Sequence, residues 1–494
     1  MNAYPDEVID EHGERFALEP EPLGVGGQGA VFRCKTNPSV AVKLVLDGAG
    51  RPLRREDGGV VDEISARISN GIEIVRTLDL PDDVGIALPA SRLEQHVGYT
   101  MTLLEDMAPI QQLIAPGGCE DLAAFYAEGG GLKRRLVLLT KLARQLARVH
   151  GRGITYVDLS PQNVFISTDP LYDELWLIDP DNMRYSVNLR ETVYTPFYGA
   201  PEIVRGDIGA TTLSDRFSFA ALAYKVLCQR DAFLGARVED VGWDEAEVDE
   251  DLELKAQRGA FPWVEDPADD SNYAENGIPA SWLLPDSIIG LFQRAFGSDE
   301  AHGEGRDKPG QRPSLVEWFD VLTREAMMLF TCPNCKNTRH IYANRGACTW
   351  CDSVDHPDII YVQSRTYVPD EDLLEPGLAP EALMKSRVHA SAILPLDRHQ
   401  TLLGPPLTSP LLCEARTRFD IEVYPDTNGA HFKALGQAGD VELTDAGRVH
   451  PLSSPHFVDF RGRTAPWRID CGPFDQQHRV LSLGFFAGGG SDEG

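Results

Sequence analysis

Residues 154–166 read ITYVDLSPQNVFI, which is the most informative stretch of this sequence. Asp158 and Asn163 stand five residues apart in it. The stretch follows residues 132–150, whose apolar residues recur at helical spacing, and it ends in a strand-like apolar run. A carboxylate at such a junction can orient a hydroxyl group and accept its proton, and an asparagine five residues later can hold Mg²⁺. We therefore interpret this stretch as a catalytic loop.

A second carboxylate lies at the end of the strand predicted at 175–178. The segment LWLIDPD places Asp179 there. Mg²⁺ prefers one or two carboxylates together with substrate phosphates. An aspartate at a strand end is usually a turn residue, but its spacing from Asp158 favours a metal-bridging role.

A glycine-rich turn lies near the N-terminus, in the segment LGVGGQGAV at 23–31. The backbone N–H groups of such a turn can face phosphates. The motif alone is a weak indication of function, but the apolar segment VAVK follows it and ends at Lys43. A lysine on that strand can reach back to the phosphates of a nucleotide.

A lysine that points into a cleft needs a carboxylate to hold it. We choose Glu63, in a helix predicted near 54–70, and Glu56 is the competitor. Either residue could instead be an ordinary exposed acid of a helix.

Three further segments lie downstream of the predicted catalytic loop. They are TPFYGAPE, which ends at Glu202, SDRFSF with Asp215, and QRPS with Arg312. Together with the glycine-rich turn, Lys43 and the catalytic loop, and in the same order, they resemble a eukaryotic-type (Hanks-type) bacterial serine/threonine protein kinase over residues 19–328. In that family the late arginine pairs with the glutamate of the A-P-E motif.

The resemblance implies an α+β, bilobal protein kinase fold with an N-lobe at 19–104 and a C-lobe at 105–328. It implies ATP and Mg²⁺ (or Mn²⁺) as cofactors and a protein as substrate. The catalytic residues would be Lys43, Asp158, Asn163 and Asp179, with Asn163 and Asp179 holding magnesium. The nucleotide site would be formed by Gly24, Gly26, Gly27, Gly29, Val31, Ala41, Lys43, Glu63, Met101 and Leu103. Thr195 matches the threonine that bonds near the catalytic aspartate in serine/threonine kinases, which favours Ser/Thr over Tyr as acceptor.

The catalytic loop departs from the family pattern. The family's His-Arg-Asp is Tyr156-Val157-Asp158, so no arginine is present there to hold an activation-segment phosphate. We therefore expect that phosphorylation at Thr192, Tyr194 or Thr195 is not the main activating switch.

Two further departures leave an alternative open. Ser160 stands where the family has a lysine, and Pro180 and Asp181 replace the last two residues of D-F-G. The missing lysine removes a positive charge near the γ-phosphate. The alternative is a pseudokinase scaffold that binds nucleotide and docks partner proteins.

Four of the nine cysteines form two C-x-x-C pairs: Cys332, Cys335, Cys348 and Cys351. Two such pairs, twelve residues apart, are typical of a zinc ribbon, which we place at 329–358. Four thiolates leave no open position, so the predicted zinc is structural. His340 and His356 lie nearby and are interpreted as bystanders.

The S-P-x-N loop, the I-D-x-D segment, the F-x-R-A-F helix at 292–296 and the zinc ribbon together resemble one bacterial kinase subfamily. Its members are found beside von Willebrand A-domain proteins and metal-dependent protein phosphatases, often in stress-response settings. The resemblance therefore implies these two classes as partners.

The remaining segments are less specific. Acidic residues at 237–275 suggest a solvated insertion, and residues 359–386 are predicted to be a linker. Alternation of apolar runs and turns at 387–490 predicts an all-β domain, whose role the sequence does not indicate.

The composition argues against nucleic-acid and membrane partners. The net charge is -30 and the pI about 4.7, so nucleic acid is not an expected partner. The N-terminus does not read as a signal peptide, and no apolar run approaches the roughly 18 residues that span a bilayer. We expect no membrane partner and a cytoplasmic location.

Overall fold

The computed structural model shows a chain divided into two compact units. The first comprises residues 1–130 and 134–322, and the second comprises residues 131–133 and 323–494. The structure describes residues 4–26, 29–56, 59–60, 63–186, 193–239, 251–340, 346–368, 384–397, 401–408, 420–426, 428–435, 441–445, 447–461, 467–473 and 476–488.

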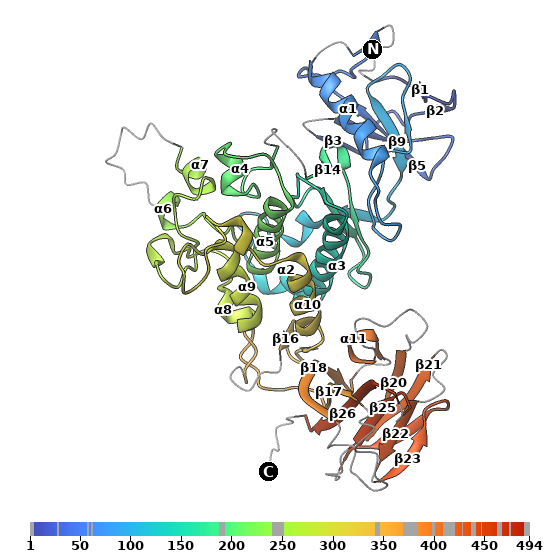
Figure 1. The fold of residues 1–494 in the computed structure, drawn as a ribbon, viewed down its shortest axis with the longest axis vertical. Helices are drawn as coiled ribbons and strands as arrows, with labels where there is room; N and C mark the ends of the chain where they lie inside the picture. The colour runs from blue at the N-terminus through green and yellow to red at the C-terminus, as the bar shows by residue number, and fades with distance from the viewer. Residues whose placement is uncertain are drawn as a thin grey trace. The chain divides into compact units, whose positions relative to one another are not determined.

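A five-stranded antiparallel sheet and one helix form the N-terminal part of the first unit (Figure 1). In spatial order the strands are β3 (Gly24–Gly26), β4 (Gly29–Arg33), β5 (Val40–Val45), β9 (Gly98–Thr102) and β8 (Ser91–Arg92). β5 is the middle strand, and every residue after its first is buried. Its nearly continuous apolar sequence explains that place, since a polar-out strand would expose one face.

The remaining elements of this part are α1 (Glu63–Thr77) and the pairs β1 (Glu7–Ile9) with β2 (Arg15–Ala17) and β6 (Arg55–Glu56) with β7 (Gly59–Val60). The helix predicted near 54–70 therefore begins later than expected, because the residues before Glu63 pair as short strands. It also extends further, to Thr77.

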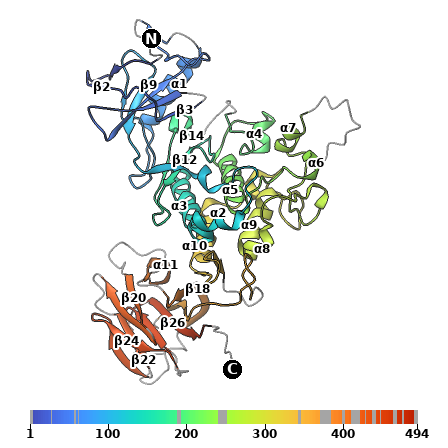
Figure 2. The same ribbon diagram turned by 180° about the vertical axis from the view of Figure 1, so that it is seen from behind.

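Helices dominate the rest of the first unit and surround the buried helix α5 (Thr212–Cys228) (Figures 1 and 2). The other elements are β10 (Met107–Pro109), η1 (Ile110–Leu113), α2 (Leu122–Glu128), α3 (Gly131–Gly151), β11 (Ile154–Thr155), β12 (Val164–Ser167), β13 (Leu175–Leu177), η2 (Pro180–Asn182), β14 (Arg184–Tyr185), α4 (Pro201–Val204), α6 (Ala236–Glu239), α7 (Leu252–Gln257), η3 (Asp270–Asn272), α8 (Ala280–Leu283), α9 (Asp286–Phe296), η4 (Pro309–Gln311) and α10 (Leu315–Ala326).

Aromatic rings pack α5 against α9 and α10. Tyr224 of α5 meets Phe292 of α9 edge-on at 5.2 Å, and Phe219 meets Trp318 of α10 at 5.4 Å between ring centroids. Such pairs add about 0.5–1.5 kcal/mol each to the burial of the rings. α5 is thus a rigid support for the loops that its first turn contacts.

The prediction of a solvated insertion at 237–275 is wrong for its described part, residues 237–239 and 251–275. Trp263 is buried and packs against Tyr224 of α5 with 5.6 Å between ring centroids. Asn272 is also buried, and its amide nitrogen donates to the Pro262 carbonyl at 2.8 Å. The acidic residues dominate the composition of this segment, but a few large apolar residues anchor it to the helical core.

The second unit begins with a short hairpin and continues into two antiparallel sheets. The hairpin joins β15 (Leu329–Thr331) and β16 (Thr338–His340). In spatial order, the six-stranded sheet contains β18 (Met384–Pro395), β17 (Ile359–Tyr367), β26 (His478–Phe486), β25 (Trp467–Cys471), β22 (Val441–Asp445) and β23 (Arg448–Pro451). The four-stranded sheet contains β19 (Thr401–Leu403), β20 (Asp420–Asp426), β21 (Gly429–Leu435) and β24 (His456–Asp459), and α11 (Pro405–Thr408) follows β19.

One apolar core joins the two sheets. Ile360 and Val362 of β17 belong to the same buried cluster as Phe432 of β21 and Val458 of β24. Successive side chains of a strand point to opposite faces, so alternate residues of each strand face this core.

The prediction of a linker at 359–386 is wrong at its start. Residues 359–367 form β17, which pairs along its whole length with β26 and lies second in the six-stranded sheet. Residues 384–386 belong to β18, and residues 369–383 lie outside the described residues. The acidic, proline-containing stretch after Tyr367 concealed the alternating strand pattern before it.

Among the residues that the structure describes, no helix combines the length and the apolar character needed to cross a membrane.

Candidate functional site

Asp158 lies in the loop between β11 and β12, where it contacts two predicted site residues. Thr195 Oγ1 donates a hydrogen bond to Asp158 Oδ1 at 2.7 Å. The Asn163 side-chain nitrogen donates to the Asp158 carbonyl oxygen at 2.8 Å, and it also approaches Asp158 Oδ2 at 3.5 Å. The two residues of the predicted catalytic loop and the threonine of TPFYGAPE are therefore brought together.

Asp215, at the start of α5, fixes the backbone of this loop. Its carboxylate is fully buried and accepts hydrogen bonds from the Tyr156 N–H at 2.7 Å and the Val157 N–H at 3.0 Å. It also pairs with His150 Nε2 at 2.9 Å. Val157 has a φ of 83°, a left-handed conformation that is unfavourable for a β-branched residue. Asp215 holds this conformation, which directs Asp158 into the site.

Burial raises the pKa of Asp158, and the nearby Asp179 carboxylate raises it further. The hydrogen bond from Thr195 acts in the opposite direction and lowers the pKa, because it stabilises the charged form. The acidity of Asp158 therefore depends directly on the Thr195 hydroxyl.

Replacing Thr195 by Val will move the acid limb of the pH–rate profile to higher pH. Loss of the hydroxyl removes a contact that lowers the pKa of Asp158, so the carboxylate will protonate at a higher pH than in the wild type. The measurement is phosphate transfer as a function of pH. Thr195→Ser keeps the hydroxyl and is the matched control. An acid limb that stays in place in Thr195→Val would contradict this assignment.

Lys43 points from β5 to two carboxylates of the segment that follows β13. Its ammonium group donates to Asp181 Oδ2 at 2.7 Å and to Asp179 Oδ1 at 2.9 Å. Burial alone would lower the pKa of Lys43, but the surrounding Tyr99, Asp181 and Asp179 outweigh it, so that the pKa lies well above its usual value. The Lys43 side chain therefore stays protonated and carries its positive charge from the middle strand of the sheet.

Asp181 is a site residue that sequence reasoning missed as a partner of Lys43, because it stands out in the sequence only as a replacement of the last residue of D-F-G. The signal was present in the carboxylate pair of D-P-D, because two aspartates two residues apart can both reach one lysine. The predicted partner Glu63 is the first residue of α1, but its side chain and that of Glu56 lie outside the described residues.

The glycine-rich turn is formed by β3 and β4. Gly24 and Gly26 are exposed in β3, and Gly27 lies outside the described residues. Gly29 is buried in β4, where an added Cβ would lie 2.6 Å from the Leu44 carbonyl oxygen. Only glycine therefore allows β4 to approach β5 so closely at this position.

Four further residues predicted for the nucleotide site lie on neighbouring strands or directly after one. Val31 of β4 pairs with Lys43, and Ala41 of β5 pairs with Met101 of β9. The chain leaves β9 at Leu103, whose N–H donates to the Ser39 carbonyl at 2.9 Å. Val31, Ala41 and Met101 thus come from the sheet that also carries Lys43, and Leu103 directly follows its strand β9.

Two residues of the catalytic loop that depart from the family pattern, Ser160 and Val157, have buried side chains. Ser160 is 1% exposed, and Val157 is also buried. Neither side chain can supply the charge of the lysine or arginine that it replaces. Of the three residues considered as phosphorylation sites, Thr192 lies outside the described residues.

The oxygen ligands of the site fit a magnesium ion. The Asp179 side chain remains 37% exposed although one of its oxygens binds Lys43. Asn163 uses its amide nitrogen to bind the Asp158 backbone, which leaves its amide oxygen as the atom suited to a cation. Carboxylate and amide oxygens are ligands that Mg²⁺ accepts. Asn163 and Asp179 are therefore the residues that would hold it.

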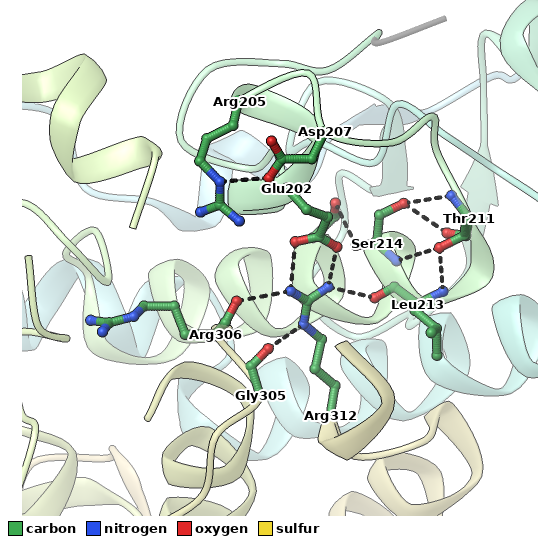
Figure 3. A network of polar contacts seen from close by, with 10 residues as sticks. Glu202, Arg205, Asp207, Thr211, Leu213, Ser214, Gly305, Arg306 and Arg312 are labelled. Atoms are coloured by element: carbon green, nitrogen blue, oxygen red, sulfur yellow. Dashed lines mark hydrogen bonds and ion pairs between the residues drawn. The ribbon is translucent and has the colours of Figure 1, made fainter. Parts of the chain in front are cut away.

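Glu202 and Arg312 form a buried, bidentate ion pair (Figure 3). The two nitrogen–oxygen distances are 2.7 and 2.8 Å, and the residues are 5% and 2% exposed. Arg312 also donates to the carbonyl oxygens of Gly305 at 2.6 Å and Leu213 at 3.0 Å. The pair predicted from the sequence thus ties the TPFYGAPE segment to the first turn of α5 and to η4.

The four cysteines of the C-x-x-C pairs lie within one cluster in the second unit. Their sulfur atoms are all within 4.8 Å of one another. Cys332 and Cys351 are 3.8 Å apart and Cys335 and Cys348 are 3.6 Å apart between sulfurs. Tetrahedral zinc with Zn–S bonds of about 2.3 Å requires sulfur separations of about 3.8 Å. The cluster therefore has the dimensions of a zinc site.

The two cysteine turns share one backbone design. In each, the residue after the second cysteine has a left-handed conformation, with φ of 63° at Lys336 and 56° at Asp352. In each, the N–H of that residue donates to the carbonyl of the first cysteine, at 3.1 Å for Cys332 and 2.8 Å for Cys348. Such paired knuckles hold four thiolates without an open position, which suits a structural metal. Neither His340 nor His356 belongs to the cluster found among the described residues.

Zinc removal will destabilise the second unit. We expect one zinc per chain in the purified protein, and Cys348→Ser will lose it together with a lower melting temperature for this unit, because metal binding is part of its folding free energy. Elemental analysis and thermal denaturation measure both effects. Cys119→Ser, which changes a free cysteine outside the cluster, is the control. Zinc-free protein with an unchanged melting profile would contradict the assignment.

Curated proteins similar to this chain are protein kinases. The serine/threonine-protein kinase pkn2 of Myxococcus xanthus is 28% identical over 234 residues, covering 43% of this chain and 24% of that protein. The DNA damage-responsive serine/threonine-protein kinase RqkA of Deinococcus radiodurans is 29% identical over 241 residues, covering 48% and 32%. The calcium/calmodulin-dependent protein kinase type IV of Mus musculus is 24% identical over 247 residues, covering 48% and 47%. The chain thus spans less than half the length of these relatives.

A similarity to solved structures and a family match complete the comparison. The kinase domain of ROP18, solved with AMP-PNP and sucrose, is 18% identical with a TM-score of 0.40, covering 65% of this chain and 86% of that one. The family description "Protein kinase domain" matches residues 19–270, which is just over half of the chain. These residues contain Lys43, Asp158, Asn163 and Asp179 in the geometry described above. The chain belongs to the protein kinase family.

Proposed function

We propose that this chain is an ATP-dependent protein kinase that phosphorylates Ser/Thr hydroxyls of a partner protein in bacterial signalling or stress response. The observation that carries the proposal is the convergence of Lys43 and Asp179, 2.9 Å apart, beside an Asp158 that is bonded to Thr195 and Asn163. This set provides a cation for phosphates, oxygen ligands for Mg²⁺ and a carboxylate for the acceptor hydroxyl.

Each residue then has a defined task. Lys43 binds the α- and β-phosphates of ATP, and the glycine-rich turn covers them. Asp158 orients the acceptor hydroxyl and accepts its proton, which its raised pKa favours. Asn163 and Asp179 would hold Mg²⁺, which neutralises charge on the phosphates when it is bound. The non-arginine catalytic loop removes the usual cation for an activation-segment phosphate, so we propose that activity does not require one.

The Thr195 contact supports Ser/Thr over Tyr as the acceptor. Its hydroxyl donates to the Asp158 carboxylate, the contact that the family resemblance associates with serine/threonine kinases. The two bacterial relatives, pkn2 and RqkA, are both serine/threonine-protein kinases.

A nucleotide-binding scaffold is the second candidate, and Ser160 favours it. The side chain at this position is buried and neutral, so it cannot neutralise the transferred phosphoryl group. A site of this kind would keep the phosphate contacts of Lys43 and lose much of the transfer rate.

The second unit would bind zinc and would not take part in phosphate transfer itself. The cysteine cluster would form a zinc ribbon with a structural ion, which stabilises its module or docks a partner. From the subfamily resemblance we propose a metal-dependent protein phosphatase and a von Willebrand A-domain protein as partners. Binding of each purified candidate to the full chain tests this.

The test of acceptor class is phosphoamino-acid analysis after incubation with labelled ATP and Mg²⁺. We expect phosphoserine or phosphothreonine in the chain itself or in a co-purified partner, and no phosphotyrosine. Lys43→Met is the control for contaminating kinases. Phosphotyrosine alone would overturn the Ser/Thr assignment, whereas nucleotide binding without transfer would favour the scaffold.

A further inference from the structure

The two carboxylates that bind Lys43 differ in their exposure to solvent. The Asp181 side chain is 6% exposed, and the Asp179 side chain is 37% exposed. A buried carboxylate cannot exchange a buried ammonium partner for water without a large loss of free energy. The exposed carboxylate can turn to other ligands at much lower cost. Asp181 is therefore the permanent partner of Lys43, and Asp179 is the one available to a metal.

The backbone of Asp181 is fixed by α1. The helix packs against η2, and a Cβ at Gly71 would lie 2.5 Å from the Asp181 carbonyl oxygen. Only glycine at this position lets the helix come so close. Pro180, the first residue of η2, restricts the backbone immediately before Asp181. The position of the helix and that of the Asp181 carboxylate are thus linked through the main chain.

Tyr99 is a further buried neighbour of Lys43. It lies in β9, opposite Lys43 in the strand register, and is fully buried. The Lys43 ammonium group is 5.7 Å from the centre of its ring. Lys43 is therefore confined between an aromatic face and the two aspartates, and Asp181 is the only buried carboxylate that contacts it among the described residues.

We propose that Asp181 is the positioning residue that holds Lys43 against the nucleotide phosphates, the role that the sequence analysis gave to Glu63. In this arrangement α1 acts on Lys43 through its backbone contact with Asp181 at Gly71. The inference rests on the proposed function, since it assigns Lys43 to phosphates. It adds a second, distinct task to the D-P-D segment, with Asp179 for the metal and Asp181 for the lysine.

A double-mutant cycle between Asp181 and Lys43 tests the inference. The variants are Asp181→Asn, Lys43→Met and the double variant, and the readout of the cycle is the Kd for ADP, with EDTA and with Mg²⁺; kcat is compared between Asp181→Asn and the wild type alone. We expect Asp181→Asn to weaken ADP binding about tenfold, the effect of losing a charge-assisted hydrogen bond. In the Lys43→Met background the same substitution should change the Kd less than about twofold, because its effect passes through Lys43.

The exposed Lys141–Asp173 pair provides the matched control. Its ammonium and carboxylate are 2.8 Å apart with side chains 43% and 46% exposed, so Asp173→Asn should leave the Kd for ADP unchanged. Effects of Asp181→Asn and Lys43→Met that simply multiply in the double variant would show a structural role and overturn the inference. So would a cycle in which Glu63→Gln couples to Lys43 and Asp181→Asn does not.

A second variant covers the case in which Asp181→Asn does not fold. Gly71→Ala keeps every charge and pushes α1 away from the Asp181 carbonyl, so it should lower ADP affinity in the wild type but not in Lys43→Met. Equal losses in both backgrounds would overturn the inference. Wild-type protein that binds ADP and transfers no phosphate would refute the proposed kinase activity, and the cycle on Kd would still decide the role of Asp181.

Discussion

Replacing Asp158 by Asn will lower kcat for phosphate transfer by roughly 10²–10⁴-fold, the usual contribution of a general base. Asn keeps the size of the side chain and can still accept from Thr195 Oγ1, so the loop should keep its shape. It removes the carboxylate that accepts the proton of the acceptor hydroxyl. The Kd for ATP should change less than about threefold, because an interaction made in the transition state alone affects kcat and not ground-state binding.

Steady-state kinetics and a direct nucleotide-binding measurement separate these two effects. Asp173→Asn is the control, because its carboxylate lies in the connection between β12 and β13, is 46% exposed and pairs with Lys141. A loss of ATP affinity that accounts for the whole loss of activity would assign Asp158 to nucleotide binding. Unchanged kcat would remove it from the mechanism.

Replacing Arg312 by Leu will destabilise the first unit by about 3–5 kcal/mol, because it leaves the Glu202 carboxylate buried without a cation. Arg312 is 2% exposed and makes two short bonds to Glu202. The same substitution also leaves the carbonyl oxygens of Gly305 and Leu213 without their donor. Urea denaturation measures the change in the free energy of unfolding.

The Arg294–Glu317 pair is a control of the same chemistry on the surface. Its nitrogen–oxygen distance is 2.9 Å, but the side chains are 44% and 45% exposed. Arg294→Leu should therefore cost no more than about 1 kcal/mol. The double variant Arg312→Leu with Glu202→Leu should recover part of the stability lost in the single variant, since no unpaired charge remains. Similar losses for Arg312→Leu and Arg294→Leu would show that burial of the first pair has no energetic consequence.

The motif residues could be predicted because each follows from chemistry that tolerates few residue types. Only a carboxylate can serve at Asp158, and only a glycine fits at Gly29, where a Cβ would meet the Leu44 carbonyl. The ion pair of Glu202 with Arg312 followed from the order of motifs alone, and the structure shows both bonds. The cysteine cluster could be predicted for a similar reason, since each C-x-x-C turn has the same local backbone geometry.

Features that depend on tertiary packing are harder to predict from the sequence. The spacing of D-P-D allows Asp181 to reach Lys43, but the contact itself depends on the packing of η2 against α1. The acidic composition around Trp263 predicts a solvated segment, whereas this aromatic residue is buried. The linker prediction is wrong for β17, whose residues alternate between the two faces of a sheet, because its partner strand β26 lies more than a hundred residues later.

Transfer of the labelled γ-phosphate from ATP to protein tests the central claim most directly. The purified full chain is incubated with Mg²⁺ and labelled ATP, alone and with candidate partner proteins, beside Lys43→Met and Asp158→Asn. The account predicts label in protein with the wild type and little or none with either variant. Labelling that is equal in all three proteins would show a contaminant. Absence of label in every reaction, with ADP binding intact, would contradict kinase activity and establish the chain as a nucleotide-binding scaffold.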